Sequence, residues 1–234
     1  MLLNDYIITP ITHLFFPNLC QACGSELLSN EQNVCTFCIH ELHKTNFHLM
    51  INNPVEQKLF GRVNFENATS IFYFNKKSKV QHLIHLFKYK RNFEVGKLLV
   101  KLMLQQLEYY RWIGDIELIV PLPLSKQKLK LRGFNQSEFI ANEIGQSLNI
   151  PINNTDLIRV KHSSSQTNKS NLERIKNVQN AFSIKDVQCF QDKHVLLIDD
   201  IITTGATIES CIQNLNVIKN CKVSVLSIAY ATDL

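Results

Sequence analysis

The apolar residues of this chain recur with a helical period in three segments. Three- and four-residue intervals predict one amphipathic helix over 78–88 and a longer one over 94–110. A third helix is expected after residue 138. The apolar stripes are Val80, Leu83, Ile84 and Phe87; then Val95, Leu98, Leu99, Leu102 and Leu107; then Phe139, Ile140, Ile144 and Leu148.

Short apolar runs between these helices predict strands over 68–74, 118–124 and 195–198. The strand over 118–124 is expected to end at its two prolines, because proline cannot continue a central ladder. The uninterrupted run 195–198 suits a strand that is buried on both faces, as in a parallel sheet. Strands that alternate with helices in this way predict an α/β fold.

The run 195–198 leads into the segment that indicates the most chemistry. Asp199 and Asp200 stand where the strand is expected to end, and a small hydroxyl-rich turn and a helix over 208–219 follow them. Backbone N–H groups, hydroxyls and the helix dipole favour a phosphate, while carboxylates accept hydrogen bonds from ribose hydroxyls. We therefore predict a pocket for a phosphorylated sugar. The turn is Thr203, Thr204, Gly205, Ala206 and Thr207.

A Walker B-type nucleotide site is the alternative, because there too an apolar strand ends in carboxylates, one of which holds Mg²⁺. Such a site requires a loop of the form G-x-x-x-x-G-K-[ST]. The one Gly-Lys pair is Gly96-Lys97, with Arg91 in place of the first glycine and Leu98 after the lysine. The sequence thus excludes a P-loop and favours the sugar-phosphate pocket.

Four cysteines near the N-terminus form two pairs, Cys20-x-x-Cys23 and Cys35-x-x-Cys38, with eleven residues between the pairs. Two such knuckles can place four thiolates around one Zn²⁺, which would supply folding free energy to a segment too short for a core. Two disulfides are the alternative, but nothing in the sequence suggests secretion, and cytosolic thiols stay reduced. We expect a structural zinc site.

The formal net charge is +5, and part of the basic charge is clustered. Basic clusters suit phosphates on a small ligand or on nucleic acid, although a solvated surface explains the first cluster equally well. The first cluster is Lys76, Lys77, Lys79, Lys88, Lys90 and Arg91; the second is Lys126, Lys128, Lys130 and Arg132.

Composition adds limits on location. Hydrophobic residues make up 45% and charged residues 19%, which is ordinary for a globular protein. No stretch approaches the ~20 apolar residues that a membrane-spanning helix needs. The apolar N-terminus carries Asp5, His13 and two prolines, and it lacks the basic start and cleavage site of a signal peptide. We predict a cytoplasmic protein.

The acidic pair and its turn resemble the phosphoribosyl-diphosphate (PRPP) signature of type I phosphoribosyltransferases. In their order, the motifs of the chain resemble the ComF family, also called ComFC or GntX-like proteins. This resemblance implies a type I phosphoribosyltransferase fold, with helices flanking a parallel sheet and a small N-terminal zinc ribbon. The matching stretches are LFFPNLCQACG, HLFKYKR, PLPLSKQKLKLRGFNQSE, SSSQTNKSNLERIKNVQNAF and VLLIDDIITTGAT.

The resemblance also implies domains and residue roles. It divides the chain into a zinc ribbon over 1–50, a connecting region over 51–112 and a phosphoribosyltransferase-like domain over 113–234. Asp199 and Asp200 would bind the ribose hydroxyls and act in catalysis, and the turn would hold the 5-phosphate of PRPP, which binds with Mg²⁺. A loop after the strand over 118–124 would hold the pyrophosphate. The residues implied there are Leu122, Pro123, Leu124, Lys126 and Arg132.

Residues 159–177 are polar and rich in serine. An exposed loop explains this composition, and so does a lid that closes over the sugar and excludes water; the position between the two phosphate-binding segments favours the lid. Gln166, Thr167 and Arg174 would belong to it. One departure from the family is Ser125, since many members carry histidine there.

The family is associated with natural competence, and this implies a PRPP-binding protein of the DNA-uptake machinery. The zinc module and residues 76–91 would then contact single-stranded DNA or a helicase-like ATPase. A catalytically active phosphoribosyltransferase of nucleotide or base metabolism is the alternative. We expect the first, with transferase activity left open.

Overall fold

The computed structural model describes residues 17–160 and 181–232. Its strands β1 (Asn67–Phe74), β2 (Leu118–Pro121), β5 (His194–Ile202) and β6 (Lys222–Ala231) form one four-stranded sheet. The order is β1-β6-β5-β2, and every neighbouring pair runs parallel. The α/β class expected from the sequence is confirmed.

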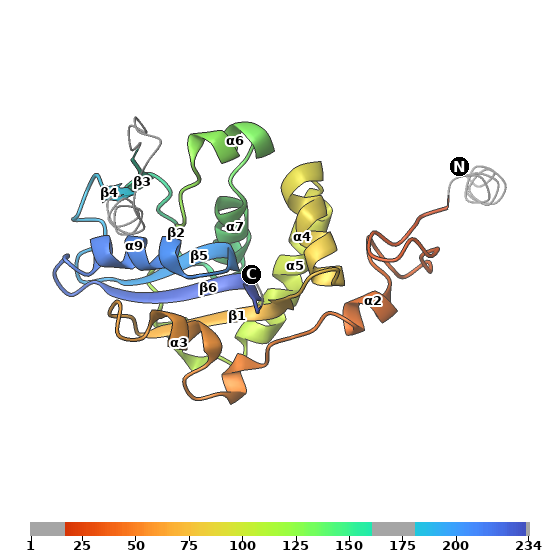
Figure 1. Cartoon of the computed structure of the whole chain (residues 1–234), viewed down its shortest axis with the longest axis horizontal. Coiled ribbons are helices and arrows are strands. Elements are labelled where there is room, and N and C mark those ends of the chain that lie inside the picture. Colours follow the sequence, from red (N-terminus) through yellow and green to blue (C-terminus); the bar gives the residue numbers. More distant parts are fainter. Residues whose placement is uncertain (1–16, 161–180, 233–234) are drawn as a thin grey trace, which may run out of the picture.

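Helices cover both faces of the sheet, and Figure 1 shows α7 and α3 on opposite sides. One face packs against α4 (Lys79–Lys90), α5 (Phe93–Leu107) and α7 (Gln136–Leu148); the other packs against α3 (Pro54–Leu59) and α9 (Ala206–Leu215). Shorter elements are α2 (Thr36–His40), α6 (Lys126–Arg132) and the 3₁₀ helices η2 (Phe47–Leu49) and η3 (Arg111–Asp115).

Strand β5 shows how the sequence builds two cores. Leu196 and Ile198 pack with α4, α5 and α7, while Val195 and Leu197 pack with α9. Successive side chains of a strand point to opposite faces, so an uninterrupted apolar run serves both cores at once.

Helix starts are fixed by polar side chains that precede them. Ser78 accepts a hydrogen bond from the N–H of Gln81 (3.1 Å), and Asn92 accepts one from Val95 (3.2 Å). Each side chain satisfies an N–H group that the helix leaves open. The helix predicted over 78–88 is therefore present as α4, and the one predicted over 94–110 is present as α5, three residues shorter at its C-terminal end.

Three elements differ from the sequence prediction in extent or type. β2 stops at Pro121, as expected, but β5 continues through Asp199 and Asp200 to Ile202. The basic segment expected in or beside a loop forms α6, because Ser125 caps it by accepting from the N–H of Lys128 (3.3 Å). α9 begins two residues earlier than predicted, at Ala206, and ends at Leu215.

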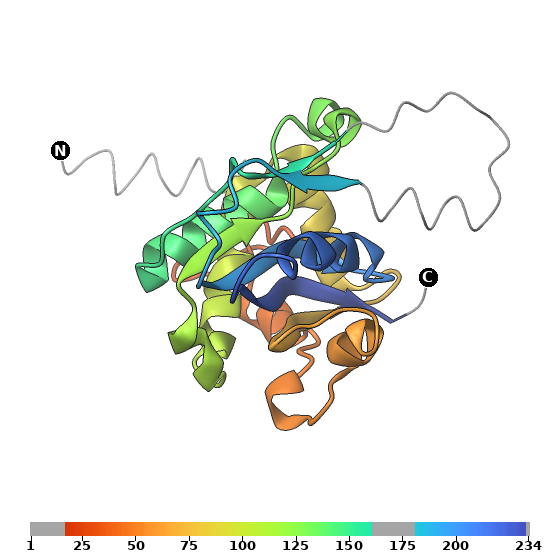
Figure 2. The ribbon, with the colours of Figure 1, turned by 90° about the vertical axis from the view of Figure 1, so that its left-hand side faces the viewer.

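A two-stranded antiparallel sheet lies apart from the main one: β3 (Leu157–Arg159) pairs with β4 (Phe182–Ile184). Figure 2 shows this pair beside the main sheet. Ile152 also forms a parallel bridge to Ile119 and so extends the main sheet beyond β2. The lid is predicted over 159–177; Arg159 ends β3, and residues 161–177 lie outside the described residues.

The region 51–112 contributes β1 to the main sheet, where β1 is hydrogen-bonded to β6. The domain boundaries near residues 50 and 112 stay a prediction. Among the described residues, none of the helices combines the length and apolar character that a membrane crossing needs.

Candidate functional site

The candidate site lies at the carboxyl ends of β2 and β5. Pro121 and Ile198 are in register, and the N–H of Leu122 donates to the carbonyl of Ile198 (2.9 Å). β5 continues into α9 on one face of the sheet, whereas β2 leads to α7 on the other. Ligands of parallel α/β sheets bind where connections diverge in this way.

Asp200 is the acidic residue with cationic partners. Its Oδ2 lies 2.8 Å from Nζ of Lys88 and 3.7 Å from Nη1 of Arg132. The exposed fractions of Asp200, Lys88 and Arg132 are 8%, 7% and 8%. Charged residues buried to this degree are rare unless they are paired.

Arg132 is held by several further contacts. Its Nη1 donates to Oε1 of Gln136 (2.7 Å), and its guanidinium carbon lies 5.3 Å from the ring centroid of Tyr89. Its carbonyl accepts from Nε of Arg91 (2.9 Å). Its own Nε is buried without a hydrogen-bond partner among the described residues, which leaves one donor open for a ligand.

Asp199 has a different environment, although it is the next residue in the strand. Its Oδ1 accepts from Oγ of Ser137 (3.2 Å) and from the N–H of Asp200 (2.8 Å). Burial and the neighbouring charge of Asp200 raise the pKa of Asp199 to about 7, against the opposing effect of Lys88 and Ser137. One carboxylate of the pair is therefore ion-paired, and the other titrates near neutral pH.

The turn after β5 has the backbone that a tight strand–helix connection requires. Gly205, with φ of +78°, occupies the position before the first residue of α9, and Oγ1 of Thr204 accepts from the N–H of Ala206 (3.4 Å). Asp199 and the residues 201–208 line a small hollow of about 30 Å³. Nζ of Lys58 donates to the carbonyl of Thr203 (2.5 Å) and fixes the turn from the side of α3.

The structure brings most of the predicted residues together at this edge. Asp199, Asp200, the turn and Leu122 lie around the ends of β2 and β5, and Arg132 reaches Asp200 from α6. Pro123 and Leu124 follow Leu122 directly, and Lys126 is exposed on the first turn of α6. Gln166, Thr167 and Arg174 lie outside the described residues.

Lys88, Gln136 and Ser137 have no role in the sugar-phosphate pocket that the sequence predicts. All three stand in stretches quoted for the family resemblance, HLFKYKR and RGFNQSE. Lys88 was placed in a basic cluster that a solvated surface explained equally well. The missing information is tertiary, since only the packing of α4 and α7 brings these side chains to the end of β5.

A groove of about 720 Å³ opens beside the site along α4. It is lined by Lys88, Tyr89 and Thr203 at the site, and it extends to Ala22 next to the cysteine cluster. Among the described residues that line the groove, the charged ones are all lysines. Two histidines, His82 and His85, also line it. The groove therefore suits an anionic ligand.

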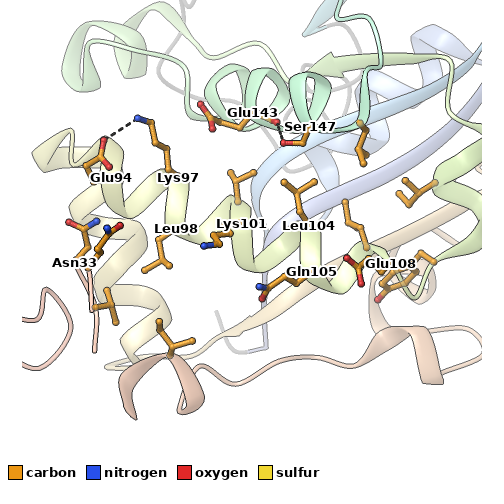
Figure 3. A pocket seen from close by; sticks show the side chains of 18 of the residues that line it. Asn33, Glu94, Lys97, Leu98, Lys101, Leu104, Gln105, Glu108, Glu143 and Ser147 are labelled. Carbon is orange, nitrogen blue, oxygen red and sulfur yellow. Dashed lines mark hydrogen bonds and ion pairs between the residues drawn. The ribbon is translucent and has the colours of Figure 1, made fainter. Parts of the chain in front are cut away.

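A second, larger hollow of about 1190 Å³ lies between the cysteine module, α5 and α7 (Figure 3). Acidic and basic side chains mix on its walls, among them Glu94 and Lys97, which pair at 3.1 Å. It contains none of the predicted sugar-phosphate residues. Its charges are balanced and partly paired, so it gives no indication of a particular ligand.

The four cysteines of the N-terminal module converge. The Sγ atoms of Cys20, Cys23, Cys35 and Cys38 all lie within 4.8 Å of one another, and Cys23 and Cys35 are 3.8 Å apart. A tetrahedral zinc site with Zn–S bonds of ~2.3 Å places its sulfur atoms ~3.8 Å apart. N–H groups of Ala22 (3.4 Å) and Cys35 (3.2 Å) point at the sulfur of Cys20. The donor set fits a structural zinc ion.

The cysteine module is docked on α4. Lys79 forms an ion pair with Glu41, and its Nζ lies 5.1 Å from the ring centroid of Phe37. Nε2 of His82 is 2.9 Å from the carbonyl oxygen of Gln21. The same helix thus contacts the module at its N-terminal half and Asp200 through Lys88 near its C-terminal end.

The parallel sheet, the acidic pair at its carboxyl edge and the hydroxyl-rich turn define a phosphoribosyltransferase-like α/β protein, here carrying a four-cysteine module. No protein-family model matches the chain. Curated relatives do: Competence protein F of Haemophilus influenzae is 28% identical over 193 residues, covering 81% of this chain and 74% of that protein. DNA utilization protein YhgH of Escherichia coli O157:H7 is 25% identical over 220 residues, covering 86% of this chain and 91% of that protein.

Competence protein ComFC of Bacillus subtilis matches over a shorter stretch, with 34% identity over 90 residues, 38% of this chain and 34% of that protein. The names of these relatives support the ComF family that the sequence motifs resemble.

Solved structures give only a remote likeness. The allosteric regulatory enzyme of purine biosynthesis has a TM-score of 0.40 and 20% identity, over 56% of this chain and 25% of that one. Adenine phosphoribosyltransferase from Leishmania tarentolae has a TM-score of 0.37 and 15% identity, and the match covers 79% of this chain and 95% of that one. The chain thus spans a quarter of the length of the first of these structures, and the assignment does not depend on either.

Proposed function

We propose that the protein binds PRPP with Mg²⁺ at the carboxyl edge of β2 and β5 and acts in DNA utilization, as the names of its relatives suggest. The observation that carries this proposal is the meeting of two carboxylates, a hydroxyl-rich turn before α9 and a buried arginine at one sheet edge. The cytoplasm is the expected location, since a four-thiolate module needs a reducing compartment.

Each part of PRPP has a group of matching chemistry in this arrangement. Asp199 and Asp200 accept hydrogen bonds from the ribose hydroxyls, and the N–H groups and hydroxyls of 203–207 surround the 5-phosphate at the start of α9. Arg132 and the residues after β2 face the pyrophosphate, where Mg²⁺ would neutralise part of the charge. The residues expected there are Leu122, Pro123, Leu124 and Lys126.

A catalytically active phosphoribosyltransferase is the second candidate. In that reaction the bond from ribose C1 to the pyrophosphate oxygen breaks, pyrophosphate leaves with the electron pair, and a nitrogen nucleophile bonds to C1. The site would contribute positioning and stabilisation of the leaving group's charge. The buried open donor of Arg132 favours this candidate, because it adds a cationic contact where leaving-group charge develops.

Calorimetric titration of the zinc-loaded protein with PRPP and Mg²⁺, followed by a pyrophosphate-release assay, tests both candidates. Binding without release supports the DNA-utilization role, and release on addition of a base or amine establishes a transferase. Absence of binding at millimolar PRPP would remove the proposal.

We also propose that single-stranded DNA, alone or with a helicase-like ATPase, contacts the basic groove along α4 and the cysteine module. The groove supports this because the lysines and histidines on its walls suit a phosphate backbone. Affinity for a single-stranded oligonucleotide should then fall steeply between low and moderate salt. Affinity that does not change with salt, or no binding at low salt, would contradict this part.

A further inference from the structure

Lys88 is a buried lysine that α4 delivers to the end of β5. The residue before it, Phe87, is fully buried in the core between α4 and α7, so the helix cannot turn Lys88 away without losing that packing. The exposed fraction of Lys88 is 7%, and its Nζ contacts Oδ2 of Asp200 at 2.8 Å. Lysines are seldom buried to this extent without a function or a strong partner.

Lys88 shares its partner with a second cation. Nη1 of Arg132 lies 3.7 Å from the same oxygen of Asp200, so both positive groups converge on one carboxylate oxygen. Nε of Arg132 has no hydrogen-bond partner among the described residues and is buried. The two cations carry two positive charges, and Asp200 neutralises one of them. The remaining charge and the open N–H donor of Arg132 are available to an anionic ligand.

The parts of PRPP can be matched to this cluster by charge. The ribose hydroxyls are neutral and need acceptors, which the carboxylates supply. The 5-phosphate is assigned to the turn before α9, the helix that packs on the face of the sheet opposite α4. The pyrophosphate is the remaining anion, and it needs the donors that Lys88 and Arg132 provide.

We propose that Lys88 and Arg132 form a cation pair that binds the pyrophosphate of PRPP. When the ribose hydroxyls donate hydrogen bonds to Asp200, Lys88 leaves its ion pair with Asp200 and contacts the pyrophosphate. This inference rests on the proposed function. In the ligand-free protein the ion pair with Lys88 keeps Asp200 from being a buried unpaired carboxylate.

The test compares Lys88→Met with Lys90→Met by PRPP titration in the presence of Mg²⁺. Lys90 is exposed on the same helix, so its substitution removes the same charge two residues away. We expect Lys88→Met to weaken PRPP binding roughly tenfold or more, because a charge-assisted contact to a phosphate is lost. Lys90→Met should bind as the wild type does.

Competition experiments identify the part of PRPP that Lys88 contacts. Inorganic pyrophosphate and ribose 5-phosphate are each titrated against bound PRPP in the wild type and in Lys88→Met. We expect the variant to lose affinity for pyrophosphate and to keep that for ribose 5-phosphate. An equal loss for both would show that Lys88 only positions Asp200, and it would overturn the proposal.

Circular dichroism and zinc content check that the variants are folded, and Lys88→Gln replaces Lys88→Met if the methionine variant is not. The glutamine can still donate to Asp200 but carries no charge, so the same loss of pyrophosphate affinity is expected. Unchanged PRPP affinity in a folded Lys88 variant overturns the inference alone. Failure of the wild type to bind PRPP overturns the proposed function itself.

Discussion

At the scale of residues, two adjacent aspartates are prepared differently by their surroundings. Asp200 is ion-paired with Lys88, while Asp199 is hydrogen-bonded by Ser137 and titrates near neutral pH. The sequence indicates the pair and its place next to a strand. It does not indicate the difference, because Lys88 and Ser137 arrive from α4 and α7 through tertiary packing.

The pair should be indispensable for ligand binding. Replacing Asp199 and Asp200 together by asparagine removes both acceptor charges and leaves Lys88 without its counter-ion, so PRPP affinity is expected to fall below detection. Zinc content and the circular dichroism spectrum should stay unchanged, since the cysteine module lies elsewhere. Unchanged PRPP affinity would place the pocket at another part of the molecule.

Asp199 should make stability depend on pH. Its raised pKa means that the folded state favours the protonated carboxyl, so the stabilisation is complete below its unfolded pKa of ~3.9 and is lost as pH rises through about 7. The asparagine of Asp199→Asn cannot ionise, so the stability of this variant should not fall with pH for this reason.

Urea unfolding of the ligand-free wild type and of Asp199→Asn, at about pH 5 and about pH 8, measures this effect. From the lower to the higher pH the wild type should lose ~2–3 kcal/mol more than the variant. The cysteine module responds to pH in both proteins and cancels in the comparison. Parallel profiles would show that Asp199 has an ordinary pKa.

At the scale of elements, the sequence predicts which segments form helices and strands better than where they end. β5 runs on through the acidic pair because backbone pairing with β6 continues to Ile202, whatever the side chains. The basic segment becomes α6 because Ser125 caps it and Gly133, with φ of +82°, ends it. The polar composition of the segment predicts a loop, but the two cap residues stabilise a short helix instead.

The contact between α4 and α5 depends on a glycine. A Cβ on Gly96 would lie 2.6 Å from Cε2 of Phe87 and 3.0 Å from Cε1 of Phe139. Gly96→Ala should therefore destabilise the protein by ~1–3 kcal/mol, although alanine favours helices over glycine. It should also weaken PRPP binding, because α4 carries Lys88.

Gly114→Ala is the control for this substitution. A Cβ on Gly114, in η3, has no heavy atom within 4 Å. Urea unfolding should show no more than a small change for this variant. If Gly96→Ala were as stable as the wild type, the two helices would have to pack less closely than the structure shows.

At the scale of the whole molecule, the cysteine module and the candidate site share α4. The sequence predicts the module and the sugar-phosphate turn as separate motifs, since about 160 residues lie between Cys38 and Asp199. Their link through Lys79, His82 and Lys88 becomes visible only when α4 is placed between them.

Removing one cysteine ligand should release the metal. Cys20→Ser leaves three thiolates, so the zinc content should fall. The free energy of unfolding should fall by on the order of 2–4 kcal/mol, because the metal contributes to folding. Atomic absorption and urea unfolding measure both effects. Cys221→Ser, half-buried and outside the cluster, is the matched control. A fully folded, metal-free Cys20→Ser protein would refute structural zinc.

The strand order has a consequence for how the chain reaches its fold. β6 lies between β1 and β5, and Asn67 pairs with Ser224, 157 residues further along. During synthesis β1 emerges well before β6 and stays without its neighbour until residues 222–231 have been made. Such distant pairing makes folding slow and leaves a strand edge open to other chains. Newly made protein is therefore expected to need protection by chaperones until β6 closes the sheet.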